Sequence, residues 1–469
     1  MLHTKKFLGL MACLIWLTAC NRESENKGTT DPPMDPPNDV VMNAYSFGEL
    51  QGQMIALNDT FVLNNKTGSV QLEYLYRAYA EPVTFPASGG GTTTLSATAI
   101  YAINDMVFVT WHIPSATYGG AICAYRQSGI GRYTFTDRVD FPEADYFELA
   151  ASENPGDGYY EVFMVGQRDP DASNYVLENH SGAVVTRIDY DFINDEFWEA
   201  SAKELPLPGP AATDIVAAAA HYFVITGDGS GGSIGGLYQV DRNLGMVEKA
   251  DQVSIDDGVA LIIDPTSQNV NAGINSDATI YALDRSGGNY RISRASVSYD
   301  YTTDQTNFVG LSPYSDNSAG PVISPIDDER GDLTWAQGSG AAVSKTDSLI
   351  IASGYEGIFE AGSTMGGSFN TATNFGPCLA TEFDPSLGVL YYADANDGVR
   401  VVAMGAYASG NTLNEYDLIG NFVPPTDNNA GTVLPSTFYI KEIALYRSRN
   451  IALATGDAGV YFLQKLNGN

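Results

Sequence analysis

The chain has 469 residues and a formal net charge of −32, with 56 acidic against 24 basic side chains. This excess of negative charge repels phosphate backbones and anionic lipid head groups, which argues against a nucleic acid partner and against membrane attachment by a basic patch. After residue 20, no apolar run approaches the roughly 18 to 20 residues that a membrane-spanning helix needs.

Residues 1–19 have the pattern of an export signal. Lys5 and Lys6 precede an apolar stretch that ends in Leu17-Thr18-Ala19-Cys20. The segment resembles a bacterial lipoprotein signal, which implies cleavage before Cys20 and acyl chains on its thiol and new amino group. Several acyl chains anchor a protein without crossing the membrane. Cleavage would remove two lysines and no acid, which gives a net charge of −34. The alternative is an ordinary secretory signal in which Cys20 is incidental.

Residues 20–43 are predicted to form a lipidated, proline-rich linker. Two Asp-Pro-Pro sequences favour extended polyproline geometry, and the segment has almost no apolar side chains with which to form a core. We expect a stalk that holds residues 44–469 away from the lipid surface. Glu23 and Glu25 loosely resemble the export signals of surface lipoproteins in Bacteroidetes. The resemblance implies an outer-membrane, lipid-anchored protein that is either periplasmic or surface-exposed.

Residues 44–469 are predicted to be all-β. Short apolar runs alternate with Asn-Asp, Asp-Gly and Gly-Gly turns, which is typical of strands joined by tight turns. A unit of strand, polar turn, glycine and strand recurs three times near the C-terminus, at 349–359, 389–402 and 451–463. The glycines at the corners are Gly357, Gly398 and Gly459, where positive φ or close approach of another strand is expected.

Looser copies of this unit extend the repeat toward the N-terminus. They lie at 107–125, 161–188, 222–240 and 259–283, with a degenerate eighth candidate at 54–76. Repeats of this length predict the blades of a β-propeller, since one small sheet cannot bury both of its faces alone. Base rates favour seven blades, and the hairpin count permits eight. A pair of β-sandwiches or a β-helix is the competing architecture.

At these repeats the chain resembles bacterial propeller lipoproteins built from LVIVD-type or YVTN-like blades. We expect the segment before Tyr45 and the last strand, 460–466, to complete one blade between the two chain ends. Cys123 and Cys378 are the cysteines that remain after Cys20. Both are flanked by apolar residues, so we predict two separate buried thiols and leave a disulfide as the alternative.

Motifs for catalysis and metal binding are weak in this sequence. Residues 231–235 match the pattern GxSxG, but the residues that follow are predicted to form a strand, whereas a nucleophile elbow requires a helix. The three histidines after residue 20 show no spacing typical of a metal site or a catalytic triad. The cofactor is therefore unknown. Clustered acids at 394–397 and 169–173 leave Ca²⁺ open as an alternative, although neither follows the spacing of a calcium loop.

The turns between paired strands are the candidate ligand-binding face, because equivalent turns of stacked blades emerge on one side. Aromatic and acidic side chains in these turns would suit a sugar or a cationic group. The candidates are Trp111, His112, Tyr118, Asp228, Tyr355, Glu356, Asp394, Asp397 and Asp457. We single out Trp111, because a large aromatic residue in a loop costs solubility unless it is packed or used.

Two classes of function follow from this interpretation. The first is a membrane-tethered binding or scaffold propeller that captures a nutrient, a glycan or a protein partner. The second is an extracytoplasmic hydrolase or lyase that uses carboxylates in the central channel of the propeller. The scarcity of histidines and of catalytic motifs favours binding over catalysis. Inward-facing carboxylates near the propeller axis would support the enzyme.

Overall fold

Among the residues that it describes, the computed structural model contains seven sheets of four or more strands, which are antiparallel apart from one short parallel edge strand. Those residues are 40–44, 54–64, 71–86, 91–113, 118–154, 156–172, 182–218, 221–227, 235–249, 255–264, 267, 269–271, 275–286, 289–300, 303, 305–317, 332–336, 349–354, 357–362, 367–368, 370–371, 378–394, 398–403, 418–428 and 432–466. The described residues form strands, turns and connecting segments, with no helix among them. The seven sheets belong to one compact unit, residues 37–469.

In six sheets the main strands follow the chain order from the axis outward, and we call the innermost strand of each sheet its first strand. The first contains β6 (Ser96–Ile103), β7 (Met106–His112), β8 (Gly120–Gly129) and β9 (Arg132–Phe141), with β1 (Asn43–Ala44) added beside β9. The second contains β10 (Ala144–Asn154), β11 (Tyr159–Arg168), β12 (Ala183–Asp191) and β13 (Glu196–Pro206). The third contains β14 (Ala211–Ala218), β15 (His221–Gly227), β16 (Gly236–Val240) and β17 (Met246–Lys249).

The next three sheets follow the same order. The fourth contains β18 (Gly258–Ile263), β20 (Asn275–Ser286), β21 (Asn289–Asp300), β22 (Gln305–Asn317) and β26 (Gly367–Ser368), with β19 (Asn269–Asn271) beside β20. The fifth contains β23 (Asp332–Ala336), β24 (Leu349–Gly354), β25 (Gly357–Gly362) and β27 (Asn370–Thr371). The sixth contains β28 (Cys378–Asp384), β29 (Val389–Asp394), β30 (Gly398–Ala403) and β31 (Leu418–Phe422).

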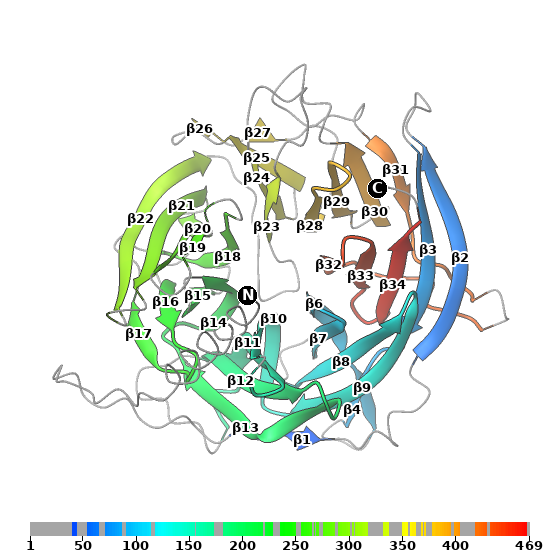
Figure 1. Ribbon diagram of the computed structural model, residues 1–469, viewed down its shortest axis with the longest axis horizontal. Coiled ribbons are helices and arrows are strands. Elements are labelled where there is room, and N and C mark those ends of the chain that lie inside the picture. Colours follow the sequence, from blue (N-terminus) through cyan, green and yellow to red (C-terminus); the bar gives the residue numbers. More distant parts are fainter. Residues whose placement is uncertain are drawn as a thin grey trace, which may run out of the picture. The chain divides into compact units, whose positions relative to one another are not determined.

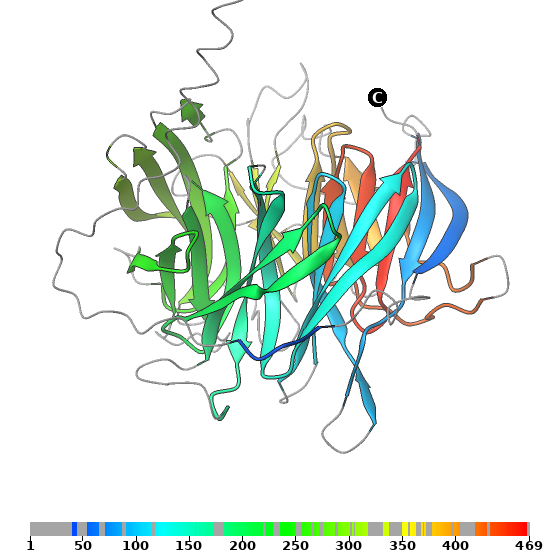
Figure 2. The same cartoon turned by 60° about the horizontal axis from the view of Figure 1, so that its bottom comes forward.

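The seventh sheet joins the two ends of the described chain. It contains β32 (Glu442–Tyr446), β33 (Asn450–Ala454) and β34 (Val460–Lys465), followed by β3 (Gln71–Ala80) and β2 (Met54–Asn64). A separate hairpin pairs β4 (Thr84–Pro86) with β5 (Thr92–Thr94). Figures 1 and 2 show blue β3 beside red β34, and the register pairs Ala80 with Val460.

The first strands of the seven sheets close a ring. The contacts run from β6 to β10, β14, β18, β23, β28 and β32, and β32 returns to contact β6. Figure 1 shows these strands around a common axis, with the other strands of each sheet farther out. The fold is therefore an all-β propeller, as the repeats predict.

Apolar side chains fill the spaces between neighbouring sheets. One core cluster joins the first and seventh sheets, a second joins the first and second, and others join the second to the third, the third to the fourth and the sixth to the seventh. Each Å² of apolar surface removed from water stabilises the fold by roughly 25 cal/mol, so these contacts are the main stabilising term. Each sheet therefore depends on its neighbours.

The C-terminal repeats form the second and third strands of their sheets. The units at 349–359, 389–402 and 451–463 are β24–β25, β29–β30 and β33–β34. Gly398 has φ +83° and Gly459 has φ +94°, and a Cβ on either would lie 2.4 Å or less from a backbone carbonyl oxygen. Both reasons expected for glycine at this corner are confirmed at these two positions.

Two of the weaker repeat assignments are corrected. The unit at 259–283 covers β18 and β20, which are the first and second strands of their sheet, so its equivalent hairpin is β20–β21. The candidate at 54–76 is β2–β3, which forms the outer part of the seventh sheet instead of a sheet of its own. The chain ends are therefore joined through β3, whereas the segment before Tyr45 contributes β1 to the first sheet.

Candidate functional site

Five acidic residues lie on the first strands of five sheets, each directly before a buried apolar residue, and we call them the axial carboxylates. They are Glu148 on β10, Asp214 on β14, Asp332 on β23, Glu382 on β28 and Glu442 on β32. Each is half-buried and precedes a buried apolar residue, because neighbouring side chains of a strand point in opposite directions. The apolar partners are Leu149, Ile215, Leu333, Phe383 and Ile443. In the first and fourth sheets Ala99 and Ala260 take the place of the acid.

The axial carboxylates face one another around the axis. Glu442 on β32 interacts electrostatically with Asp332, although β28 lies between β32 and β23 in the ring. It also interacts with Glu148 on β10, on the far side of β6. Interactions that skip a sheet in both directions require side chains that face the axis.

Burial and repulsion by neighbouring acids raise the pKa values of three of these carboxyl groups, those of Asp214, Glu382 and Glu442. Burial, followed by the charges of Asp332 and Asp384, raises the pKa of Glu382 to about 8. Burial and neighbouring acids also hold the pKa values of Asp214 and Glu442 well above their ordinary range. A group of acids that is partly protonated near neutral pH can bind cations or exchange protons.

The two aspartates accept hydrogen bonds from neighbouring sheets. Asp214 Oδ2 accepts from the backbone N–H of Leu261 on β18 at 2.5 Å, which joins two neighbouring sheets. Asp332 Oδ2 accepts a hydrogen bond from the N–H of Thr381 on β28 at 2.9 Å, which joins the fifth and sixth sheets. Both aspartates therefore help to hold the ring together, and this structural role accounts for part of their burial.

Glu382 and Glu442 differ from the two aspartates. Glu148 and Glu442 each accept a hydrogen bond from the N–H of the following residue, at 2.9 and 3.0 Å. The Glu382 side chain makes no hydrogen bond to another described residue. Glu382 and Glu442 are accordingly the axial carboxylates best suited to contact a ligand.

The loop 455–459, which joins the second and third strands of the seventh sheet, lies at the same end of that sheet as its axial carboxylate. Glu442 pairs with Ala454, directly before this loop. Asp332 pairs with Ser353, next to the last residue of the second strand of the fifth sheet. A ligand reaching Glu442 from this end would pass the loop 455–459.

Trp111 and His112 do not belong to an exposed loop, which corrects the prediction for both. They end strand β7, and Trp111 is fully buried in the core between the first and seventh sheets. His112 is also buried, with Nδ1 3.1 Å from Thr98 Oγ1 and its ring edge against Phe147. The reason is tertiary: neighbouring sheets cover a strand end that the sequence alone leaves at the start of a loop.

Tyr118 is half-buried beside this strand end. Burial, followed by the charges of Asp169, Asp145 and Asp171, raises the pKa of its hydroxyl. Asp145 accepts a hydrogen bond from the N–H of Gly119 at 3.0 Å, and burial raises the pKa of this carboxyl to about 7. Tyr118 therefore remains a candidate at the loop end of the first sheet.

The other predicted site residues fall into three groups. Asp394 is buried at the end of β29 and forms an ion pair with Arg400 at 2.9 Å, so it has a structural partner. Asp457 is exposed in the loop between β33 and β34. The remaining candidates lie outside the described residues: Asp228, Tyr355, Glu356, Asp397 and the lipidation residue Cys20.

The structure tests several of the smaller predictions. Cys123 and Cys378 are separate buried thiols, as expected. Strand β16 begins at Gly236, directly after the GxSxG match, so the strand predicted there is confirmed. Among the described residues, no group of three or more His, Cys, Asp and Glu side chains could hold a metal ion, and no helix could span a membrane.

Sequence reasoning overlooked the axial carboxylates. A signal was present, because an acid followed by an apolar residue recurs at the start of a blade in Glu148-Leu149, Asp214-Ile215, Asp332-Leu333, Glu382-Phe383 and Glu442-Ile443. The repeat was aligned on its glycine-cornered hairpins, which are the second and third strands. A comparison that included the preceding strand of each repeat would have shown the recurring pair of an acid and an apolar residue.

Comparisons with known proteins add a structural likeness. No family model matches the chain, and no curated protein matches it. A solved structure titled "Structure of Dos1 propeller" is similar over 89% of this chain and 95% of that chain, with 12% sequence identity and a TM-score of 0.46.

Proposed function

We propose that this protein is a lipid-anchored, extracytoplasmic binding propeller that takes a cationic ligand at its axial carboxylates. The observation that carries the proposal is the convergence of five acids, from the first strands of five sheets, around a common axis. Grouped carboxylates repel one another, and a bound cation would relieve that repulsion. The net charge of −32 would also draw cations toward the protein.

The anchor is proposed on the sequence alone. Lys5, Lys6 and the segment ending at Cys20 support acylation, and the proline-rich linker supports a stalk between the lipid and the propeller. We propose attachment to the outer membrane, on its periplasmic or its external side. The ligand would then be a nutrient, a glycan or a protein segment that carries a cationic group.

The test measures binding of the polyamine spermidine to the purified propeller by calorimetry at low salt. The variant Glu382→Gln/Glu442→Gln should bind at least about tenfold more weakly, which corresponds to roughly 1.4 kcal/mol. The matched control, Glu73→Gln/Glu81→Gln, removes two carboxyl groups on and beside β3, in the outer part of the seventh sheet, and should retain binding. Equal loss in both variants would indicate attraction by net charge alone, and absence of binding to the wild type would contradict the proposal.

Glu382 supports catalysis as a second candidate function. A carboxyl group with a pKa of about 8 is protonated at neutral pH, and Asp332 supplies a neighbouring acid. A protonated and an ionised carboxyl group side by side are what acid-assisted hydrolysis of a glycoside requires. A panel of nitrophenyl glycosides tests this: turnover that Glu382→Gln abolishes would support an enzyme, and turnover that it leaves unchanged would exclude this role.

A further inference from the structure

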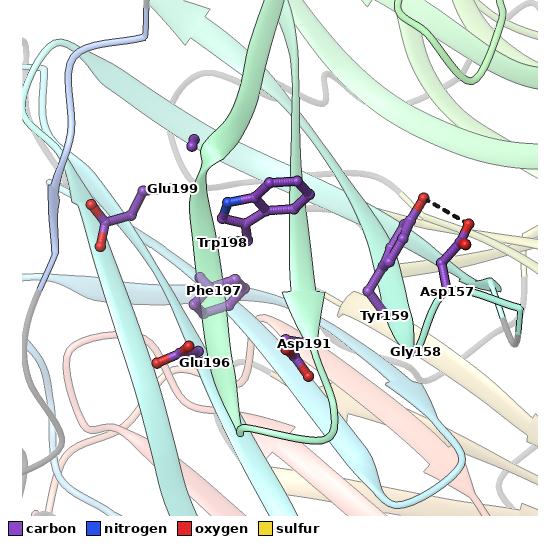
Figure 3. A pocket seen from close by; sticks show the side chains of 9 residues that line it. Asp157, Gly158, Tyr159, Asp191, Glu196, Phe197, Trp198 and Glu199 are labelled. Carbon is purple, nitrogen blue, oxygen red and sulfur yellow. Dashed lines mark hydrogen bonds between the residues drawn. The ribbon is translucent and has the colours of Figure 1, made fainter.

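A pocket on the outer part of the second sheet lies away from the axial carboxylates. It has a volume of about 670 Å³ and is lined by Asp157, Gly158, Tyr159, Asp191, Glu196, Phe197, Trp198, Glu199 and Ala200. The lining comes from the start of β11, the end of β12 and the first half of β13 (Figure 3). The first and last of these strands flank β12 on either side.

An irregular bulge in β13, in which four residues lie opposite one residue of β12, shapes this pocket. Asp189 of β12 pairs with Trp198, whereas Arg187 pairs with Lys203, so residues 199–202 lie opposite a single residue of β12. Ser201 holds the bulge: its Oγ accepts from the N–H of Asp189 at 2.8 Å and donates to the carbonyl oxygen of Trp198 at 2.6 Å. Bulges of this kind reorient side chains next to binding sites.

Trp198 is the unusual side chain in the pocket. It is 57% exposed, whereas Trp111 is fully buried. Figure 3 shows the Trp198 ring extending from β13 in the direction of Tyr159 on β11. A tryptophan held outward by a hydrogen-bonded bulge presents an aromatic face to solvent, which costs free energy unless a ligand covers it.

The charged residues that line the pocket are all acidic. Four lining residues are acidic, and none of the described lining residues is Lys, Arg or His. Asp191 accepts hydrogen bonds from the backbone N–H groups of Ile193 and Asn194, and Asp157 accepts from Asn154, so both aspartates also stabilise their turns. Glu196 and Glu199 are exposed on β13, and Figure 3 shows their carboxylates on the other side of this strand from the Trp198 ring.

We propose that this pocket binds a small alkylammonium compound through the face of Trp198 and the carboxylates that line the pocket. A tryptophan ring is the best aromatic partner for a cation, and the contact contributes about 0.5 to 2 kcal/mol. The carboxylates select positive charge over a neutral group of the same shape. The site is separate from the axial carboxylates, so it does not depend on the function proposed for them.

The experiment compares choline with its neutral isostere 3,3-dimethylbutan-1-ol by calorimetry on the purified propeller. Choline should bind at least about tenfold more tightly than the isostere, because only choline carries the charge. Trp198→Ala should weaken choline binding about tenfold, and Trp198→Phe should restore part of it. Tyr439→Ala removes an exposed aromatic ring elsewhere and should leave the affinity unchanged.

Two double variants distinguish binding in this pocket from binding at the axial carboxylates. Glu196→Gln/Glu199→Gln should weaken choline binding, whereas Glu382→Gln/Glu442→Gln should retain it. Loss only in the axial variant would place the cation at the axis and overturn the pocket. Three further outcomes would each overturn the proposal. They are equal affinity for choline and the isostere, binding of cellobiose in preference to choline, and unchanged choline binding by Trp198→Ala.

Discussion

At the scale of single residues, exposure distinguishes two tryptophans that look equivalent in the sequence. Trp111 ends a strand before a glycine-containing loop, and Trp198 lies within a polar strand. Neighbouring sheets bury the first completely, and a bulge leaves the second exposed. The two residues are therefore expected to respond differently to the same substitution.

Trp111→Ala should destabilise the propeller by about 3–5 kcal/mol, because it opens a cavity between the first and seventh sheets. Trp198→Ala should change the free energy of unfolding by less than about 0.5 kcal/mol, since its side chain is largely in solvent. Denaturant unfolding of the two variants checks both values. Similar stability of both variants would show that Trp111 is not a core residue.

Glu382 should make stability depend on pH. Its pKa rises from 4.5 to about 8 on folding, so the folded state binds the proton more tightly than the unfolded state. Stability is therefore highest below about pH 4.5 with respect to this group, and it falls as the pH rises toward 8. Glu382→Gln should raise the melting temperature at pH 8 and change it little at pH 4.5. A melting temperature that rises equally at both pH values would contradict the assigned titration.

At the scale of elements, the seventh sheet carries the closure of the ring. Strand β34 pairs with β3 from the N-terminal part of the chain, and Tyr74 on β3 shares a 2.9 Å hydrogen bond with Tyr391 on β29. Lys465 on β34 forms a buried ion pair with Asp384 on β28. The closing sheet is thus tied to the sixth sheet by both a polar network and an apolar core.

Lys465→Met should destabilise the protein by roughly 3–5 kcal/mol, because it leaves the Asp384 carboxylate buried without its cation. Lys441→Met is a suitable comparison, since Lys441 also lies in the seventh-sheet region but is more accessible to solvent. Thermal unfolding checks the difference. A cost that is equally small for both variants would mean that water reaches Asp384 in the native state.

At the scale of the whole molecule, the proposed anchor and the propeller belong to different segments of the chain. The anchor is a prediction of residues 1–20, whereas the fold is built by residues that begin at β1. Cys20→Ser should therefore release the folded protein from membranes into the soluble exported fraction, with its thermal transition unchanged. Detergent partitioning of the expressed variant checks this outcome, and a variant that stays in the detergent phase would rule out the lipoprotein assignment.

The sequence by itself determined the fold class and the hairpins of the repeat. Alternating apolar runs, turn residues and corner glycines are local signals, and Gly398 and Gly459 have the geometry that these signals require. The buried state of Cys123 and Cys378 also followed from their apolar neighbours. These properties depend on the backbone and on side chains close in the chain, so a short stretch of sequence is enough to predict them.

Only the tertiary structure decided which strands close the ring and which side chains meet. The partner of β34 is β3, more than 370 residues away by the pairing of Ala80 with Val460, and no local pattern specifies that pairing. The axial carboxylates come from five sheets, and each one is an ordinary acid in its own segment. Their raised pKa values arise from burial and from neighbours on other sheets, because electrostatic interaction depends on distance in space and not along the chain.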